Sequence, residues 1–374
     1  FAISSLLKNL SISWQNGQNI GLLEKGSDDF VRFLFILGPY RPGQCGVSDY
    51  VKLLSEALEQ RGHHCLRISI SGDKGSTFDD LRKNLPEADV ISLQFSPYAF
   101  APKGLSGSPL LRFATSICDR KLHVMFHEIW IGAYPVAPWR QCFWGWRQKR
   151  EILKFLKLAN PNWVNTTNSA ALYRLKTEGA NAKYLQLFGG IPISETKRPP
   201  KDKSYIHAIM FGTLYEKFPY EDLIAKICQL EKESSRKVQL TLVGIQREKT
   251  GVNILRKLAE QAGILIQEKG QLPPDEISLN IQRSDMAIST TPLDALGKSM
   301  STAAFLEHGL PVVAFDDGDT PVDELLLGKR FEQQILLLNE IDCVKKLLEI
   351  QDAPDRSVFD GISHTAEKML AMFS

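Results

Sequence analysis

Apolar, strand-forming segments alternate with helical segments along most of this chain. The first is residues 31–37 (VRFLFIL), an almost unbroken apolar run that leads through the glycine-rich loop 38–47 into a helical segment at 48–61. Further strands are expected at 65–70, 90–95, 121–126, 163–166 and 184–187, with helices at 79–85, 109–120, 151–159 and 169–177. Repeated strand–helix pairs are typical of a parallel sheet with helices on its faces. The pattern predicts a doubly wound, Rossmann-like α/β domain.

The alternation stops at residues 197–203 (KRPPKDK), which is typical of a linker, and then starts again. Strands are expected at 206–211, 238–243, 264–267, 286–289 and 311–315, and helices at 220–232, 251–262, 274–282, 299–308, 340–350 and 363–373. A chain of 374 residues is too long to fold around one ordinary hydrophobic core, so we expect two Rossmann-like domains facing a central cleft. We place the first at 1–195, with 1–29 as an arm, and the second at 204–345. The helices within 346–374 are expected to pack back towards the first domain.

Charge and cysteine content narrow the class of protein. The 45 basic and 43 acidic residues leave a net charge of +2, which does not favour nucleic acid as a partner. The six cysteines are scattered without a C-x-x-C pair, so we expect neither a zinc site nor a disulfide framework. No apolar run reaches the length of a membrane span. We therefore expect a cytoplasmic protein, with peripheral attachment to a membrane as an alternative.

Small and polar residues follow most of the predicted strands. In open α/β sheets, ligands bind at the carboxyl ends of the strands, so we expect these segments to face the same cleft. The segments are 38–46, 127–128, 189–190, 212–217, 244 and 292–299.

Residues 284–315 contain the clearest candidate for a ligand site. Their predicted helix opens on Gly297, Lys298, Ser299, Met300 and Ser301. Unbonded N–H groups at a helix start attract anions, small residues let a phosphate approach, and a lysine adds positive charge. A P-loop would need glycine at position 292, which is proline, so that motif is absent. We interpret the segment as an anion pocket; the alternative is an ordinary capped helix with a surface lysine.

Taken in order, these segments resemble the GT-B glycosyltransferases of the family 4-like group. The resemblance is carried by GPYRPGQCGVSDYVKLLSEAL at 38–58, HE at 127–128, FGTLYEKFPYEDLI at 211–224, LTLVG at 240–244, and SDMAISTTPLDALGKS and AAFLEHGLPVV within 284–313. It implies a GT-B fold and transfer of a sugar from a nucleotide-diphosphate sugar to a sugar, lipid or protein acceptor. It also implies that the anomeric configuration is retained and that no metal or other cofactor is required.

The resemblance also implies roles for individual residues. His127 matches a strand-end histidine beside the donor sugar, and the sequence adds Glu128 and Asp49 as acid or base candidates. The donor diphosphate and sugar are expected at Gly46, Lys217, Gly297, Lys298, Ser299, Met300 and Ser301. The base and ribose are expected at Gly244, Leu272 and Glu307.

The chain departs from the family pattern at three positions. The family usually has arginine at the place of Thr213 and glutamates at the places of Leu296 and Ala304, and Glu307 stands three residues beyond the second of these. We hypothesise that Lys298 supplies the charge that the arginine would give. The departures favour one alternative, a non-catalytic GT-B-like protein that binds a nucleotide sugar or a partner. A GT-B-type nucleotide-sugar epimerase is a second alternative.

Residues 139–157 (WRQCFWGWRQKREILKFLK) combine three tryptophans with six basic residues and one acidic residue. Three interpretations stay open. The segment could contact an anionic membrane surface, bind the acceptor as a lid, or pack as a loop with tryptophans in the core. The first two interpretations give a surface role to Trp139, Trp144, Trp146 and Arg147.

The acidic turn Asp316–Asp319 (DDGD) has two interpretations. It could bind a metal ion, but after a strand and with a glycine present it is more typical of a solvated turn. We expect no metal site.

Overall fold

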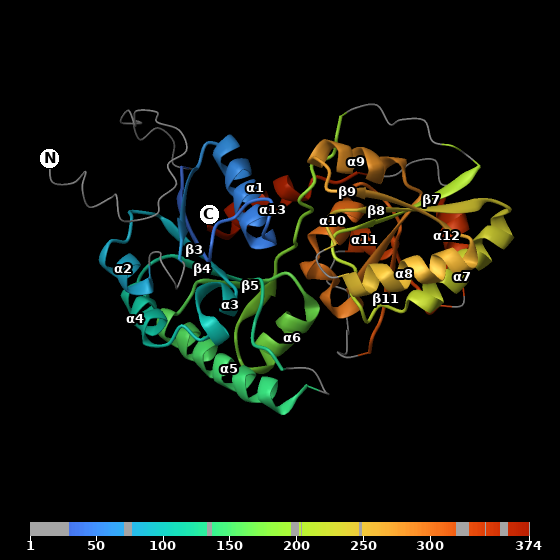
Figure 1. Cartoon of the computed structure of the whole chain (residues 1–374). Coiled ribbons are helices and arrows are strands. Elements are labelled where there is room, and N and C mark those ends of the chain that lie inside the picture. The colour runs from blue at the N-terminus through green and yellow to red at the C-terminus, as the bar shows by residue number, and fades with distance from the viewer. Residues whose placement is uncertain are drawn as a thin grey trace. The chain divides into compact units, whose positions relative to one another are not determined.

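The computed structural model describes residues 30–70, 77–132, 137–195, 202, 204–246, 249–318, 329–340, 342–351 and 358–373. The chain divides into two compact units, coloured mainly blue to green and yellow to orange in Figure 1. Unit 1 holds the described residues up to 167, those from 171 to 185 and those from 365 on. Unit 2 holds residues 168–170 and the described residues from 186 to 364. The expected arm at 1–29 and most of the expected linker at 197–203 lie outside the described residues.

Unit 1 contains a parallel sheet of six strands in the order β2-β1-β3-β4-β5-β6. The strands are β1 (Arg32–Leu37), β2 (His64–Ser69), β3 (Val90–Phe95), β4 (Leu122–Phe126), β5 (Trp163–Thr166) and β6 (Ala182–Tyr184). The helices are α1 (Gly46–Gln60), α2 (Phe78–Lys83), α3 (Pro97–Phe100), α4 (Ser108–Ser116), α5 (Trp139–Ala159) and α6 (Ser169–Thr177), with a short 3₁₀ turn at Pro102–Gly104. Strands β3 and β4 are buried throughout, which explains why apolar and polar residues do not alternate in their sequences.

Unit 2 contains a second parallel sheet of six strands, in the order β12-β11-β10-β7-β8-β9. The strands are β7 (Tyr205–Phe211), β8 (Lys237–Val243), β9 (Leu265–Gly270), β10 (Met286–Pro292), β11 (Val312–Phe315) and β12 (Ile335–Leu337). The helices are α7 (Tyr220–Ser234), α8 (Lys249–Ala262), α9 (Pro274–Arg283), the 3₁₀ helix η3 (Leu293–Lys298), α10 (Met300–Glu307), α11 (Lys329–Glu332) and α12 (Cys343–Gln351). The order of strands along this sheet reverses between β7 and β10, as in a Rossmann sheet.

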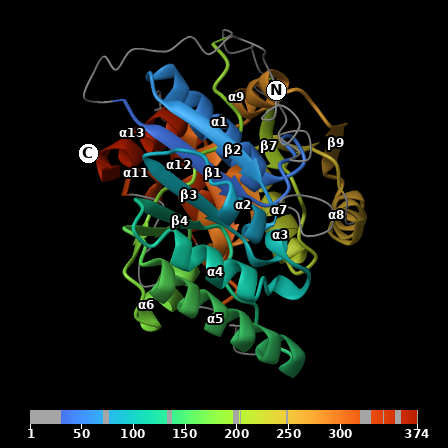
Figure 2. The same cartoon turned by 90° about the vertical axis from the view of Figure 1, so that its left-hand side faces the viewer.

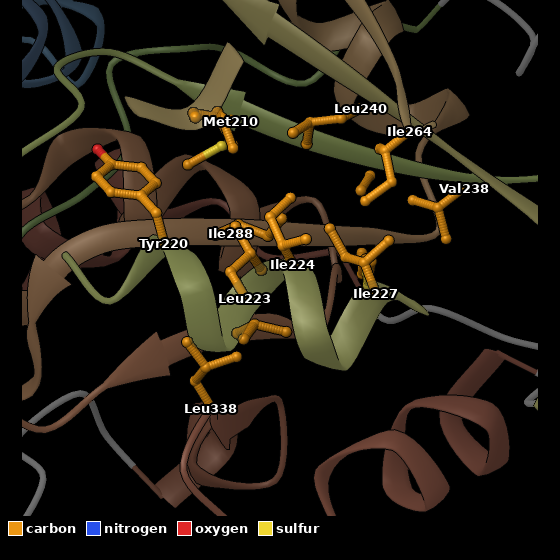
Figure 3. Close-up of a cluster of buried hydrophobic side chains, with 14 of the residues drawn as sticks. Met210, Tyr220, Leu223, Ile224, Ile227, Val238, Leu240, Ile264, Ile288 and Leu338 are labelled. Carbon is orange, nitrogen blue, oxygen red and sulfur yellow. The ribbon is translucent and has the colours of Figure 1, made fainter. Parts of the chain in front are cut away.

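The core of unit 2 forms on both faces of its sheet because successive strand residues point to opposite sides. Ile206, Ala208 and Met210 of β7 belong to one apolar cluster, whereas Ile209 belongs to the other. Figure 3 shows the first cluster, where side chains of α7 meet those of the strands. The second cluster includes residues of α9 and α10, so it supports the start of the helix predicted to bind an anion.

The last helix, α13 (Gly361–Phe373), begins in unit 2 and ends in unit 1. Its Phe373 ring contacts the Trp163 ring edge-on, with 4.6 Å between the ring centroids, and the Phe33 ring at 5.6 Å. The end of the chain therefore contributes apolar contacts to the core of unit 1.

The predicted fold class is confirmed, since both units contain parallel sheets flanked by helices. Several details differ, among them the following four. Helix α5 begins at Trp139 and not at 151, and β6 lies at 182–184 and not at 184–187. Strand β10 runs to Pro292 and not to 289, and η3 follows it where a loop was expected. Strand β12 was not expected. The start of α5 was not predicted because its buried side includes Gly145 and Gln148, so apolar residues do not recur there at helical spacing. The extension of β10 escaped prediction because its buried residues there are hydroxyl side chains.

Candidate functional site

A recess in unit 2 lies at the reversal of strand order, at the carboxyl ends of β7 and β10. Five of its lining side chains carry hydroxyl groups: Thr213, Ser289, Thr290, Thr291 and Ser301. Open α/β sheets bind ligands in the crevice beside such a reversal. The position and the hydroxyl lining make this recess a candidate site for a polar ligand.

The start of α10 is held against β10 by hydroxyl groups. Ser299 caps the helix, and its Oγ accepts a hydrogen bond from the N–H of Thr302 at 3.2 Å. The Thr302 Oγ1 lies 2.9 Å from the Ser299 Oγ and 2.8 Å from the Ser289 Oγ of β10. The N–H groups of Met300 and Ser301, in the first turn, make no hydrogen bond with a described residue. These two groups are therefore available to an anion.

The loop after β7 lies on the other side of the same recess. Tyr215 donates its N–H to the Thr290 Oγ1 at 3.3 Å, and that hydroxyl donates to the Thr213 carbonyl at 3.0 Å. Gly212 has a φ of +94°, and a Cβ placed on it would lie 3.6 Å from the Ser301 Oγ. The lack of a side chain at Gly212 leaves space beside the start of α10.

Two lysines stand on the segments that border the recess. Lys217 follows the anchored residue Tyr215, and Lys298 directly precedes the cap Ser299. Both side chains are exposed, and neither makes a hydrogen bond or ion pair with the part of the chain that the structure describes. Their ammonium groups are therefore uncommitted and could bind a phosphate as point charges.

The positions where the family has glutamates are occupied by core residues. Leu296 and Ala304 are buried in the apolar cluster that also contains Ile209. A Cβ on Gly189 would lie 2.5 Å from the Ala304 Cα, so the chain passes directly over this helix. A carboxylate at 304 would therefore be buried in an apolar cluster.

Glu307, one turn further along α10, has a different set of contacts. Its side chain is 4% exposed, and one carboxyl oxygen accepts a hydrogen bond from the Gly189 N–H at 2.9 Å. Burial raises the pKa of the Glu307 carboxyl to about 8, and the nearby Asp360 acts in the same direction. Glu307 is not among the described residues that line the recess.

The remaining residues expected at the base lie next to the recess or in the core. Gly244, at the end of β8, has a φ of +102° and donates its N–H to the Gly270 carbonyl at 2.7 Å. A Cβ on Gly244 would lie 3.4 Å from the Gly212 nitrogen, so these two strand ends are adjacent. Leu272 is half-buried against the apolar cluster around α10. Gly297 lies in η3, directly before Lys298.

In unit 1, His127 sits at the carboxyl end of β4 and belongs to a chain of buried polar side chains. Its Nε2 lies 2.8 Å from the Gln94 Oε1 on β3. The Gln94 Nε2 donates to the Ser92 Oγ at 2.8 Å, and that hydroxyl lies 2.9 Å from the Nδ1 of His123. The ring of Tyr50 from α1 packs edge-on against His127, with 5.1 Å between centroids. The imidazole of His127 is therefore held by three elements of unit 1.

The orientation of the Gln94 amide selects the tautomer of His127. With its nitrogen directed to Ser92, the Gln94 oxygen faces His127 and can only accept, so the His127 Nε2 carries the proton and the Nδ1 is an acceptor. The reversed amide would place the proton on the Nδ1. Burial lowers the pKa of His127 to about 3, with His123 acting in the same direction, so the imidazole is neutral near pH 7.

We expect nuclear magnetic resonance of ¹⁵N-histidine-labelled protein to show His127 as the neutral Nε2–H tautomer throughout the range from about pH 5 to pH 8, because its folded-state pKa lies below that range. Replacing Gln94 by glutamate should raise the pKa of His127, since a carboxylate beside the imidazole favours the charged form. A wild-type titration midpoint near 6.5 would contradict the lowered pKa, and a neutral ring protonated at Nδ1 would contradict the tautomer assignment.

The glycine-rich loop after β1 is closed by side chains of α1. The Gly43 N–H donates to the Asp49 carboxylate at 2.6 Å, and the Arg41 N–H donates to the Ser48 Oγ at 2.9 Å. Gly46 is the first residue of α1. Glu128 is exposed and accepts a hydrogen bond from the Ser96 hydroxyl at 2.6 Å. Asp49 thus has a structural contact, and the exposed Glu128 directly follows His127 in the chain.

The other predicted sites have the following positions. Trp139, Trp144, Trp146 and Arg147 lie together on α5 in unit 1. Asp316 accepts a hydrogen bond from the Gly318 N–H at 2.9 Å in a turn, and Asp319 lies outside the described residues. Within the described ranges, no group of three or more His, Cys, Asp and Glu side chains could hold a metal ion.

Solved structures match this chain along most of its length. HepE of Anabaena, in complex with UDP and glucose, is 14% identical over 91% of this chain and 95% of its own, with a TM-score of 0.51. A glycosyltransferase of Rickettsia africae is 13% identical over 92% of this chain and 93% of its own, with a TM-score of 0.55. The chain has the GT-B fold. A proposed UDP-N-acetylglucosamine 2-epimerase of Listeria monocytogenes shares this GT-B likeness, at 10% identity over 91% of this chain and 95% of its own, with a TM-score of 0.52.

No family model matches the sequence, and no curated protein matches it. At identities of 10–14% the structural likeness establishes the GT-B fold and leaves the activity to be argued from the site.

Sequence reasoning missed the polar residues that support the site. Ser92 and Gln94 lie in a strand that reads as apolar, and Ser289 and Thr302 were not assigned a role. The signal that could have revealed them is a buried strand with polar residues two positions apart, since alternate residues share one face.

Proposed function

We propose that this GT-B protein is a glycosyltransferase that takes a sugar from a nucleoside-diphosphate sugar. The observation that supports it most is the hydroxyl-lined recess of unit 2, at the reversal of strand order and beside the start of α10. Ser301 of the first turn of α10 lines that recess, and Lys217 and Lys298 lie close in sequence to its lining residues Leu214 and Ser301, an arrangement that suits a diphosphate. HepE of Anabaena, with the same fold, has been solved with UDP-glucose, which supports UDP as the first nucleotide to test.

The chemistry follows from where negative charge develops. As the glycosidic bond to the donor breaks, the leaving diphosphate gains charge. The N–H groups of Met300 and Ser301, together with Lys217 and Lys298, would stabilise that charge more in the transition state than in the ground state. In this proposal Lys298 takes the place of the arginine that the family has where this chain has Thr213.

His127 is proposed to position the sugar. A neutral imidazole with a bare Nδ1 can accept a hydrogen bond from a sugar hydroxyl without adding positive charge. Glu128, beside it, is the candidate for proton transfer to or from the acceptor. We further propose that transfer retains the anomeric configuration and proceeds without a metal ion, as the family resemblance implies.

Two alternatives have a specific observation in their favour. The apolar residues at 296 and 304 favour a GT-B-like protein that binds a nucleotide sugar without turnover. The likeness to a proposed UDP-N-acetylglucosamine 2-epimerase favours an epimerase.

One experiment separates the three functions. The protein is incubated with UDP-glucose and UDP-N-acetylglucosamine, with and without a chelator, and the mixture is followed by proton nuclear magnetic resonance. Release of UDP that the chelator does not reduce supports the transferase, and the anomeric signal of the released sugar reports retention. Inversion at the C2 carbon of the sugar would favour the epimerase, and line broadening without any product would favour the binding protein.

A further inference from the structure

Helix α5 of unit 1 is attached through one side only. The Gln148 Oε1 accepts the Ile131 N–H at 3.0 Å, and the Gln148 Nε2 donates to the Lys103 carbonyl at 2.8 Å. Glu151 accepts the N–H groups of Ser106 and Gly107 at 2.8 and 2.9 Å. Figure 2 shows α5 lying along α4, with its other side turned away from the unit. The inner side is thus fixed by polar contacts, and the outer side is left to solvent.

The outer side of α5 exposes large aromatic side chains in one row. Trp139 is 74% exposed, Phe143 48% and Trp146 49%. Their spacing of four and three residues places them on a single helix face. Isolated exposed apolar residues are ordinary, but three large rings in one row form a contiguous apolar patch.

The same side carries positive charges that form no ion pair with a described residue. Five basic side chains of α5 are exposed: Arg140, Arg147, Arg150, Lys154 and Lys157. The one acidic residue of the helix, Glu151, is used in the inner contacts, and Lys149 pairs with Glu178 at 2.8 Å. The outer face is therefore aromatic in its first half and basic throughout, with no acidic side chain.

We propose that the outer face of α5 is a docking surface for a lipid bilayer with anionic headgroups. Aromatic side chains favour the boundary between headgroups and acyl chains, and basic residues are attracted to an anionic surface. Arg140 and Arg150 stack on Trp139 and Trp146, at 5.5 and 4.8 Å from the ring centroids, so cations and rings would meet the same interface together. The helix would lie in the plane of the membrane.

The shape of the face favours a membrane over other anionic partners. A nucleic-acid strand binds in a positively charged groove with rings available for stacking, whereas this face is one side of a single helix. The net charge of +2 over the whole chain also gives little attraction to a polyanion beyond this patch. None of the described helices is long and apolar enough to cross a membrane.

Flotation with vesicles tests this proposal. Vesicles of phosphatidylcholine with about one third phosphatidylglycerol should bind the full chain, and vesicles of phosphatidylcholine alone should bind it far less, because the charge term is lost. Replacing Trp139, Phe143 and Trp146 together by serine should lower the partition coefficient about tenfold or more, because apolar burial is lost. The charge reversals Arg147→Glu and Arg150→Glu should have a comparable effect, and binding should fall with added salt.

A matched variant keeps the test specific. Tyr173, Ile245 and Leu265 are exposed at 55%, 60% and 49% on other elements, and their joint replacement by serine should leave binding unchanged. The proposal would be overturned if wild-type protein stayed with the soluble fraction, if it bound neutral vesicles equally, or if the control variant lost as much binding. Binding to single-stranded RNA in place of vesicles would assign the face to nucleic acid instead. None of these outcomes depends on the donor site in unit 2.

Discussion

Replacing Lys217 and Lys298 together by alanine is expected to weaken UDP binding roughly 100-fold, or about 2.7 kcal/mol at 25 °C. Each ammonium group is uncommitted in the described structure, so each can form a charge-assisted bond to a phosphate, and such a bond contributes about 1.5 kcal/mol or more. Each single variant should therefore lose roughly tenfold in affinity. Isothermal titration calorimetry of the four proteins with UDP gives all these values.

A control variant removes two lysine charges from other positions of unit 2. Lys232 of α7 and Lys257 of α8 are exposed, and their joint replacement by alanine should leave UDP affinity within about twofold of wild type. Equal losses in the two double variants would mean that the lysines act through net charge alone. An unchanged affinity in the Lys298→Ala variant would remove Lys298 from the donor site.

Stability is expected to fall as pH rises through the range where Glu307 ionises. The carboxyl is buried, and its folded-state pKa of about 8 lies above its value of 4.5 in the unfolded chain. A raised pKa means that the folded state holds the proton more tightly, so the stabilisation is complete below pH 4.5 and is lost as pH rises through 8. The loss from Glu307 should be on the order of 4 kcal/mol between about pH 5 and pH 9.

The Glu307→Gln variant isolates this contribution because it keeps an oxygen to accept the Gly189 N–H but cannot ionise. Urea unfolding at several pH values should give a free energy that falls less steeply in the variant, so that the variant is the more stable protein near pH 9. Parallel curves for the two proteins would show that Glu307 does not hold its proton in the fold.

The fold could be predicted from sequence because parallel strands buried on both faces produce apolar runs, as in Val31–Leu37, and the intervening segments have helical patterns. The order of strands in each sheet, and therefore the reversal beside β10, could not be read in this way. It depends on which strands pair, as β7 does with β10 across the 74 residues of sequence between Phe211 and Met286.

The candidate site was predictable only in part, for a related reason. Lys217, His127 and the start of α10 could be proposed because each follows a predicted strand or begins a predicted helix. The supporting Ser92 and Gln94 could not, since their function comes from pairing β3 with β4, which brings Gln94 to His127. Glu307 was expected near the ribose, but the fold places its carboxyl against Gly189, because the chain crosses α10 there.

The recess between the ends of β7 and β10 is proposed to bind a nucleoside diphosphate. A crystal structure of the chain with UDP tests this proposal most directly. The predicted result is a diphosphate within hydrogen-bonding distance of the Met300 and Ser301 N–H groups, with Lys217 and Lys298 turned towards it. UDP bound at another place, or a recess that stays without nucleotide in crystals saturated with UDP, would contradict the account.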